Sequence, residues 1–241
     1  MEIRGASALV TGAGRGIGRA LSLALAGAGA RVTAVARTKA ELDSLVAEIE
    51  RGGGQATAHA ADLTRREACD GAVARAVQAH GGLQVLVNNA GVGDFAPVAE
   101  TSDEAWETIF STNLTAPFRL TRAALPHLAR QGGEIFMISS LAGTNATANL
   151  AAYSASKAAL DHFSRCLMLE VRHQGIKVTI VAPGSVDTSF GGDRSLRKGP
   201  ETSWMLQPED VAQGVLDLLR TRPEAHLSRV EMRPLRPPKR A

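Results

Sequence analysis

Short apolar runs alternate along this chain with longer segments in which apolar residues recur at helical spacing. Such alternation is typical of βαβ units, in which parallel strands are joined by crossover helices. We therefore predict an α/β fold built on a parallel sheet. The runs expected to form its strands are SALVT (7–11), RVTAVA (31–36), QATAHA (55–60), LQVLVNN (83–89), GEIFMIS (133–139) and KVTIVAP (177–183).

Polar residues mark where several helices begin and end. The capping-box pattern T-x-x-E occurs at 38–41, 64–67 and 101–104 and predicts three helix starts. Pro208, followed by two acidic residues, predicts a fourth, because proline and acids both suit a first helical turn. The glycines at 52–54 are interpreted as a helix stop before a strand.

The rest of the pattern indicates one domain over residues 1–241, since no repeat, low-complexity tract or linker divides the chain. Residues 189–207 lack periodicity, and long loops in compact domains tend to be functional, so we predict a substrate lid there. Arg229–Met232 is expected to form an edge strand, followed by a basic tail at about 233–241.

Composition and charge narrow the function classes. The formal net charge is +3, and the bases gather in the tail RPLRPPKR, which we interpret as a solvated end rather than a nucleic-acid-binding segment. The two cysteines and six histidines lack ligand spacing, so no metal site is expected. Neither a leader pattern nor a membrane-length apolar run occurs, which predicts a cytoplasmic protein without a membrane partner.

A glycine-rich turn, TGAGRGIG at 11–18, follows the first expected strand and opens a helical segment. Glycines there let the backbone approach a pyrophosphate, whose charge is favoured at a helix N-terminus. A glycine turn without ligand is the alternative, but the strand and helix context favours nucleotide binding. The turn residues expected to bind the cofactor are Gly12, Gly14, Arg15, Gly16, Ile17 and Gly18.

The second expected strand ends in Ala36 and Arg37, where an NAD site usually presents an acid to the ribose hydroxyl. Arg37 together with Arg15 suits a phosphate dianion, so we predict NADP(H), with NAD(H) less favoured. The alternative for Arg37 alone is a solvated arginine at a helix start.

Several further motifs occur in order after the glycine turn: Asp62-Leu63, NNAG (88–91), Asn113, Ser140, Tyr153-x-x-x-Lys157 and PGSVDT (183–188). The ordered set resembles the short-chain dehydrogenase/reductase family. That resemblance implies a single-domain, Rossmann-type, doubly wound parallel sheet of about seven strands flanked by helices, usually as a homodimer or homotetramer. It also implies further cofactor contacts from Asp62, Leu63, Asn89, Ala90, Gly91, Pro183, Gly184, Val186 and Thr188.

The spacing of Tyr153 and Lys157 places both on one helix face, one turn apart. An ammonium near a phenol favours the phenolate, so we expect Lys157 to lower the pKa of Tyr153 and make it a general acid/base. Both residues are also expected at the cofactor. The alternative is an ordinary surface helix pair.

Ser140 ends an apolar run, where its hydroxyl can hydrogen-bond a substrate oxygen. Ser139 competes for this role, and the resemblance selects Ser140 because the family's serine stands thirteen residues before its tyrosine. By resemblance, Asn113 and a local helix distortion hold a water that relays protons to Lys157. Asn113 lies in a long helical pattern that we expect Pro117 to break.

The expected reaction is reversible hydride transfer between NADP(H) and a ketone or secondary alcohol. The front two-thirds most resembles beta-ketoacyl-ACP reductases, so 3-oxoacyl-ACP or -CoA reduction is an alternative, although the end AHLSRVEMRPLRPPKR departs from their glycine-rich strand. A non-catalytic NADP sensor or scaffold is less favoured, because the serine, tyrosine and lysine are all kept. An apolar lining would suit a hydrophobic or medium-sized ketone better than a sugar, with ordinary core packing of the same side chains as the alternative. Its candidates are Phe95, Leu141, Ala142, Phe190 and Trp204, with Asn145, Leu150 and Met205 beside them.

Overall fold

Seven parallel strands form one sheet in a computed structural model that describes residues 1–130, 132–190 and 202–237. Their order across the sheet is β3-β2-β1-β4-β5-β6-β7, which confirms the predicted fold class. Four of the strands, β1, β2, β3 and β7, coincide with the predicted runs to the residue. The seven strands of the sheet are β1 (Ser7–Thr11), β2 (Arg31–Ala36), β3 (Gln55–Ala60), β4 (Val85–Asn88), β5 (Gly133–Ile138), β6 (Ile176–Pro183) and β7 (Arg229–Met232).

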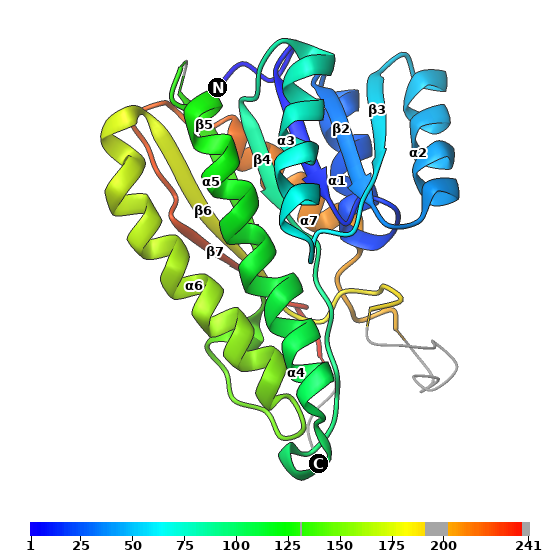
Figure 1. Cartoon of the computed structure of the whole chain (residues 1–241), viewed down its shortest axis with the longest axis vertical. Coiled ribbons are helices and arrows are strands. Elements are labelled where there is room, and N and C mark those ends of the chain that lie inside the picture. Colours follow the sequence, from blue (N-terminus) through cyan, green and yellow to red (C-terminus); the bar gives the residue numbers. More distant parts are fainter. Residues whose placement is uncertain (131, 191–201, 238–241) are drawn as a thin grey trace.

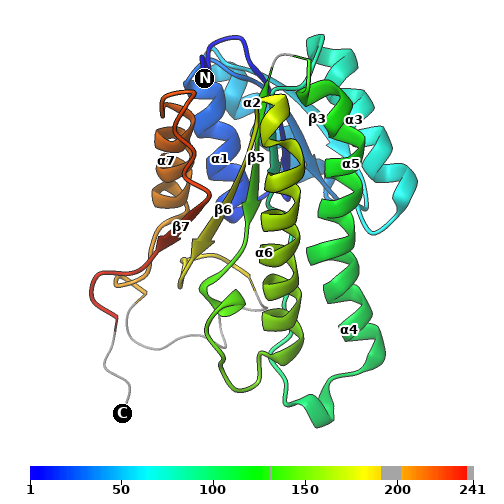
Figure 2. The same cartoon turned by 90° about the vertical axis from the view of Figure 1, so that its left-hand side faces the viewer.

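Helices cover both faces of the sheet (Figures 1 and 2). One face carries α1 (Gly16–Gly27), α2 (Lys39–Arg51) and α7 (Pro208–Leu219). The other carries α3 (Arg66–His80), α5 (Ala116–Leu128) and α6 (Ala151–Val171), and α4 (Asp103–Phe110) precedes α5. None of the helices in the described part of the chain is long and apolar enough to cross a membrane.

The central strands are buried on both sides, which explains their continuous apolar runs. In β1, Ala8 and Val10 pack into the core shared with α1, α2 and α7, whereas Leu9 packs into the core shared with α3, α5 and α6. Alternate side chains of a strand face opposite sides of a sheet, so a strand covered on both sides needs apolar residues throughout.

None of the three threonines that were predicted to cap a helix makes the side-chain capping hydrogen bond. Thr38 is the N-cap of α2, but its side chain makes no capping bond. The other two helices begin one residue later than predicted, because the threonines have other partners. Thr64 donates to Asp62 Oδ1, and Thr101 donates to the Pro97 carbonyl. Ser102 caps α4 instead, its hydroxyl accepting from the Ala105 amide.

The start at Pro208 is confirmed, and it contains a capping box that the sequence analysis missed. The side chain of Gln207 accepts from the backbone of Asp210, and the Asp210 carboxylate accepts from the Gln207 amide at 2.7 Å.

Pro117 does not break the helical segment that contains Asn113. It lies in the first turn of α5, and the five residues before that helix, Ser111–Thr115, form a π-helical turn. A proline has no N–H to donate to the carbonyl four residues earlier, which is that of Asn113. The Ala116 amide bonds to the Ser111 carbonyl, five residues back. The expected distortion at Asn113 is therefore present as a π-turn.

Two predicted segments are described only in part. Of the predicted lid at 189–207, residues 191–201 lie outside the described residues, as do 238–241 of the predicted tail. On either side of the first gap, Val186 forms a parallel bridge with Leu206, and the Asp187 amide donates to the Leu206 carbonyl.

Candidate functional site

A cavity of about 1060 Å³ opens at the carboxyl ends of the strands. In doubly wound sheets this edge is the usual place for a ligand. The cavity runs from the glycine turn after β1 to Tyr153 on α6, and it is lined by every predicted site residue except Gly18 and Asn113. The sequence motifs therefore meet at one place, although they are spread over 177 positions from Gly12 to Thr188.

The glycine turn depends on residues without side chains. Gly12 and Gly16 have φ values of +64° and +54°, a region that other residues rarely adopt. Gly18 does not line the cavity, and its role is packing. A Cβ at Gly18 would lie 2.1 Å from the Gly12 carbonyl oxygen and 2.6 Å from Asn89 Nδ2. Helix α1 can therefore approach the turn only with glycine at this position.

Asn89 ties the end of β4 to this turn. Its Nδ2 donates to the Thr11 carbonyl at 2.8 Å, and its backbone amide donates to Thr11 Oγ1 at 3.0 Å. The amide of Ala90 donates to the same hydroxyl at 3.0 Å. These bonds fix the strand ends that border the middle of the cavity.

Charged side chains surround the far end of the cavity. Arg15 and Arg37 are both exposed at its edge. Asp62 accepts from the amide and the hydroxyl of Thr64, and these hydrogen bonds lower its pKa. Sequence analysis missed Glu41 as a site residue. A Cβ on Gly14 would collide with Glu41 Oε2, so this carboxylate lies directly against the glycine turn. An acid is thus present beside the two arginines.

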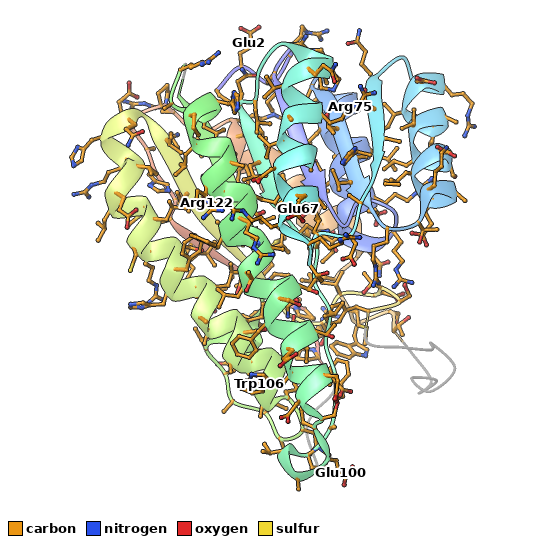
Figure 3. The ribbon with its side chains drawn as sticks, in the orientation of Figure 1. Glu2, Glu67, Arg75, Glu100, Trp106 and Arg122 are labelled. Atoms are coloured by element: carbon orange, nitrogen blue, oxygen red, sulfur yellow. The ribbon has the colours of Figure 1, made fainter. Side chains whose placement is uncertain are left out.

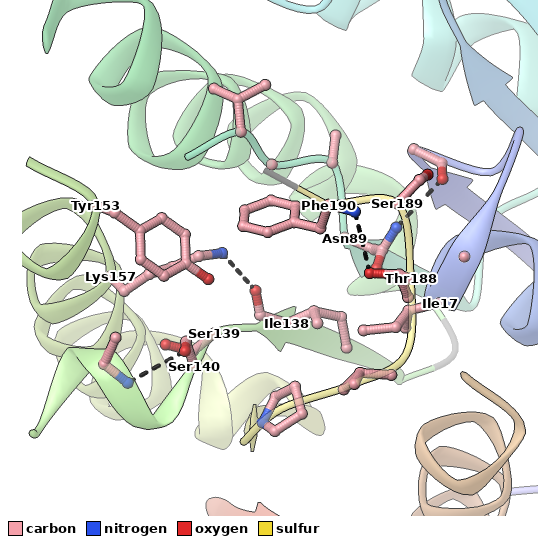
Figure 4. A pocket seen from close by; sticks show the side chains of 18 of the residues that line it. Ile17, Asn89, Ile138, Ser139, Ser140, Tyr153, Lys157, Thr188, Ser189 and Phe190 are labelled. Atoms are coloured by element: carbon pink, nitrogen blue, oxygen red, sulfur yellow. Dashed lines mark hydrogen bonds between the residues drawn. The ribbon is translucent and has the colours of Figure 1, made fainter. Parts of the chain in front are cut away.

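Tyr153, Lys157 and Ser140 converge at the other end (Figure 4). The Lys157 side chain is buried, its Nζ donates to the Ile138 carbonyl at 2.8 Å, and it lies 5.8 Å from the centroid of the Tyr153 ring. Ser140 Oγ accepts from the Ala142 amide at 3.1 Å. Three groups able to hold or move a proton therefore face one space.

The prediction that the pKa of Tyr153 is lowered was wrong. Burial raises the pKa of Tyr153, and a hydrogen bond with Ser140 opposes that rise only in part. Burial also lowers the pKa of Lys157 from its ordinary value of 10.5 to about 8, while the charge of Asp161 opposes the change. The low-dielectric surroundings of the pair thus outweigh the attraction that its helical spacing predicted.

Asn113 lies behind the cavity wall and hydrogen-bonds to the segments that form it. The residue is fully buried in the π-turn, with Oδ1 accepting from the Val92 amide at 2.9 Å and Nδ2 donating to Ser156 Oγ at 3.0 Å. Ser156 in turn donates to the Tyr153 carbonyl at 2.7 Å. Asn113 thereby joins the loop after β4 to helix α6, and its role in a water relay stays a prediction.

Aromatic rings occupy the predicted substrate end. Phe190 lies 5.5 Å from Tyr153 between ring centroids, and Phe95 packs edge-on at 6.5 Å from Phe190. Gly93 makes room for the Phe190 ring, since a Cβ there would lie 3.1 Å from two of its atoms. Trp204 also lines the cavity. The predicted apolar lining is thus brought together beside Tyr153.

The basic tail adds a wall that the sequence analysis missed. Arg233, Pro234 and Pro237 line the cavity, and Pro234 packs on Gly184, where a Cβ would lie 3.2 Å from its ring. No local pattern marked these residues, because their position depends on β7 pairing with β6 at the sheet edge.

Comparisons with known proteins found related sequences and structures. A family profile described as short chain dehydrogenase matches residues 6–198. A 2,3-dihydro-2,3-dihydroxybenzoate dehydrogenase of Bacillus subtilis is 33% identical, over 90% of this chain and 90% of that protein. A 3-oxoacyl-(acyl-carrier-protein) reductase of Thermotoga maritima is 33% identical, over 90% of this chain and 92% of that protein. The crystal structure of a metagenomic short-chain oxidoreductase in complex with NADP superposes with a TM-score of 0.85 at 36% identity, covering 98% of this chain and 100% of that one.

Proposed function

This chain belongs to the short-chain dehydrogenase/reductase family, and from that premise we propose that it is an NADP(H)-dependent oxidoreductase acting on a ketone and the corresponding secondary alcohol. The observation that carries the proposal is the convergence of Ser140, Tyr153 and Lys157 at one end of the cavity whose other end is the glycine turn. A shared cavity of this kind suits hydride transfer between a dinucleotide and a small carbonyl compound.

The residues present fit a dinucleotide. The turn at Gly14 and Gly16 leads into the N-terminus of α1, where backbone amides and the helix dipole favour a pyrophosphate. Thr188 reaches the same turn, its Cγ2 lying 3.2 Å from the position of a Cβ on Gly16. We assign the pyrophosphate to this turn and the carboxamide of the nicotinamide to Thr188 and Val186. When bound, the nicotinamide would supply or accept the hydride.

Tyr153 is the proposed proton donor to the carbonyl oxygen. Its raised pKa keeps it a phenol near neutral pH, which is the form that a reduction needs. Ser140 would donate a hydrogen bond to the same oxygen and stabilise the charge that develops there. Because burial lowers the pKa of Lys157 only to about 8, the side chain is protonated in most molecules at pH 7, and the ammonium favours the phenolate that is left after proton transfer. These pKa directions favour reduction at neutral pH.

The preference for NADP(H) rests on Arg15 and Arg37, and the NADP complex of the metagenomic relative supports it. Glu41 provides the opposing argument, since a carboxylate can accept from a ribose hydroxyl and repels a phosphate. We favour NADP(H) because two guanidiniums outnumber this carboxylate. The kcat/KM values for NADPH and NADH compare the two directly, and a higher value for NADH would reverse the assignment.

A substrate panel tests the reaction class. Purified protein and NADPH are mixed with aliphatic, aryl and cyclic ketones and with beta-ketoacyl thioesters, and the loss of nicotinamide absorbance is followed. Turnover of at least one ketone is expected. Turnover confined to thioesters would favour the second candidate, 3-oxoacyl thioester reduction, which the 33% identical Thermotoga relative supports. Cofactor binding without turnover of any carbonyl compound would contradict both.

We also infer that the protein is a homo-oligomer. Trp106 of α4 and Phe118 of α5 are large apolar side chains that remain 44% and 42% exposed, and Leu169 of α6 is 55% exposed. Figure 3 shows Trp106 and Arg122 on the outer side of α4 and α5. Exposed aromatic residues on neighbouring helices are typical of an interaction surface. Light scattering on the purified protein measures the oligomeric state.

A further inference from the structure

A second charged residue lies on α6, one turn beyond Lys157. The side chain of Asp161 is almost fully buried, and its Oδ2 accepts from Arg229 Nη1 at 2.6 Å. The other oxygen, Oδ1, is buried and accepts no hydrogen bond from the residues that the structure describes. A buried carboxylate with one unsatisfied oxygen is costly, and the fold places this one next to the proposed catalytic pair.

The surrounding backbone makes room for this carboxylate. Gly143 ends the short helical turn Leu141–Gly143 that follows Ser140. A Cβ on Gly143 would lie 3.0 Å from Asp161 Oδ2 and 3.2 Å from the Lys157 carbonyl carbon. Asp161 therefore sits where the Ser140 segment, helix α6 and strand β7 meet.

Arg229 connects this point to the cavity wall. Its guanidinium also contacts Glu231 Oε1 at 3.3 Å, and Glu231 Oε2 accepts from Arg233 Nη2 at 2.7 Å. Arg233 lines the cavity. Two carboxylates and two guanidiniums thus alternate from α6, along β7, to the edge of the site.

We propose that Asp161, buried one helical turn from Lys157 and clamped by Arg229 of β7, is a positioning residue that keeps the Lys157 side chain charged beside Tyr153, so that strand β7 contributes to the reaction. This inference rests on the proposed function, because it assigns Asp161 a role through Lys157. Burial lowers the pKa of Lys157, and Asp161 is the charge that opposes this effect.

The ionisable groups on α6 itself and on the elements packed against it also bear on the charge of Lys157. The elements packed on α6 include β5, β6, α4, the turns Leu141–Gly143 and Ser111–Thr115, and the turn Arg172–Gln174 at its C-terminal end. The first two of these turns contain no ionisable residue. Besides Tyr153, Asp161 and Arg229, these are the exposed His162, Arg165, Cys166 and Glu170 of α6, Glu134 of β5 and Lys177 of β6 near the starts of those strands, the exposed Asp103, Glu104 and Glu107 of α4, Glu231 of β7, and Arg172 and His173.

The experiment measures the charge of Lys157 without any substrate. The chain contains only five lysines, so ¹³C-labelled lysine gives few signals, and Lys157→Arg assigns the one of interest. In the full-length wild type this signal should titrate near 8. Asp161→Asn, which keeps the shape of the side chain, should titrate about one pH unit lower. Asp161→Glu retains the charge and should titrate near the wild-type value.

The direction of the change separates this role from a structural one. If Asp161 only stabilised the fold, its loss would expose Lys157 and move its pKa up towards 10.5. An unchanged or higher pKa in Asp161→Asn would therefore overturn the proposal, as would a lowered value in Asp161→Glu. Asp217→Asn is the matched control, because Asp217 is also a helical aspartate paired with an arginine, Arg220, but lies exposed on α7, across the sheet.

The link to the reaction has its own readout. With a substrate from the ketone panel, the high-pH limb of kcat/KM should move to lower pH in Asp161→Asn, in parallel with the lysine signal. A limb that stays in place while the signal moves would overturn the role in catalysis. If no carbonyl compound is turned over by any variant, the proposed function has failed, and the lysine titration still decides the effect of Asp161 on Lys157.

Discussion

Replacing Lys157 by methionine should remove activity and, at neutral pH, increase stability. The lysine is 4% exposed, and burial lowers its pKa from 10.5 to about 8. At about 1.36 kcal/mol for each pH unit, that lowering corresponds to about 3 kcal/mol, which is the cost at pH 7 of burying the ammonium rather than the neutral amine. Methionine is of similar length and carries no charge, so the variant avoids this cost.

A lost hydrogen bond offsets part of the gain. Lys157 Nζ donates to the Ile138 carbonyl, and an unsatisfied buried acceptor costs about 1–3 kcal/mol. We therefore expect the free energy of unfolding of Lys157→Met at pH 7 to exceed that of the wild type by about 0–2 kcal/mol.

The pH dependence provides the sharper test. Between pH 8 and pH 10.5 the lysine is neutral in the folded wild type but still protonated in the unfolded chain. The unfolded state then binds one more proton, so the wild type should gain about 1.36 kcal/mol per pH unit relative to the variant. By pH 10 the wild type should therefore be the more stable of the two proteins.

Guanidinium unfolding of both proteins at pH 7, 8, 9 and 10 measures this difference. Tyr153 is present in both, so its own titration largely cancels. If the difference between the two unfolding free energies were constant over this range, Lys157 would not have a depressed pKa, and the reasoning about its burial would be refuted.

Two further predictions concern the cofactor end of the cavity. Arg37→Ala should raise KM for NADPH about tenfold, the effect of losing about 1.4 kcal/mol of binding free energy, and leave KM for NADH unchanged. Arg51→Ala, at the exposed end of α2, is the control and should alter neither KM. Equal increases of KM for both cofactors in Arg37→Ala would argue against a phosphate contact. Gly18→Ala should lower stability by about 1–3 kcal/mol and weaken NADPH binding, because its Cβ meets the Gly12 carbonyl at 2.1 Å. Gly27→Ala on the same helix, with nothing within 4 Å of its Cβ, is the control, and a Gly18 variant as stable as it would contradict the packing argument.

The fold was largely predictable because its strands are continuous apolar runs bounded by turn residues. Strands β1, β2 and β3 each occupy the predicted run, and β7 was placed correctly at Arg229–Met232. Helix starts were less predictable, since a capping pattern does not reveal which partner a hydroxyl will choose. Thr64 bonds to Asp62 two residues away, and this local turn moves the start of α3.

Site residues that belong to short sequence motifs could be predicted, whereas those that reach the cavity through tertiary packing could not. Glu41 had a local explanation as the acid of a capping box, yet its carboxylate lies against Gly14. Arg233 and Pro234 reach the cavity only because β7 pairs with β6. The pKa of Tyr153 depends on burial, which helical spacing does not report.

The most direct test of the proposed mechanism is Tyr153→Phe, because Tyr153 is the only tyrosine in the chain and the change removes one hydroxyl. With a ketone from the panel and NADPH, kcat should fall by at least about 10²-fold, the usual contribution of a positioned general acid. The dissociation constant for NADPH, measured by fluorescence titration, should be nearly unchanged. A Tyr153→Phe variant that retains near-wild-type kcat would contradict the account of the site.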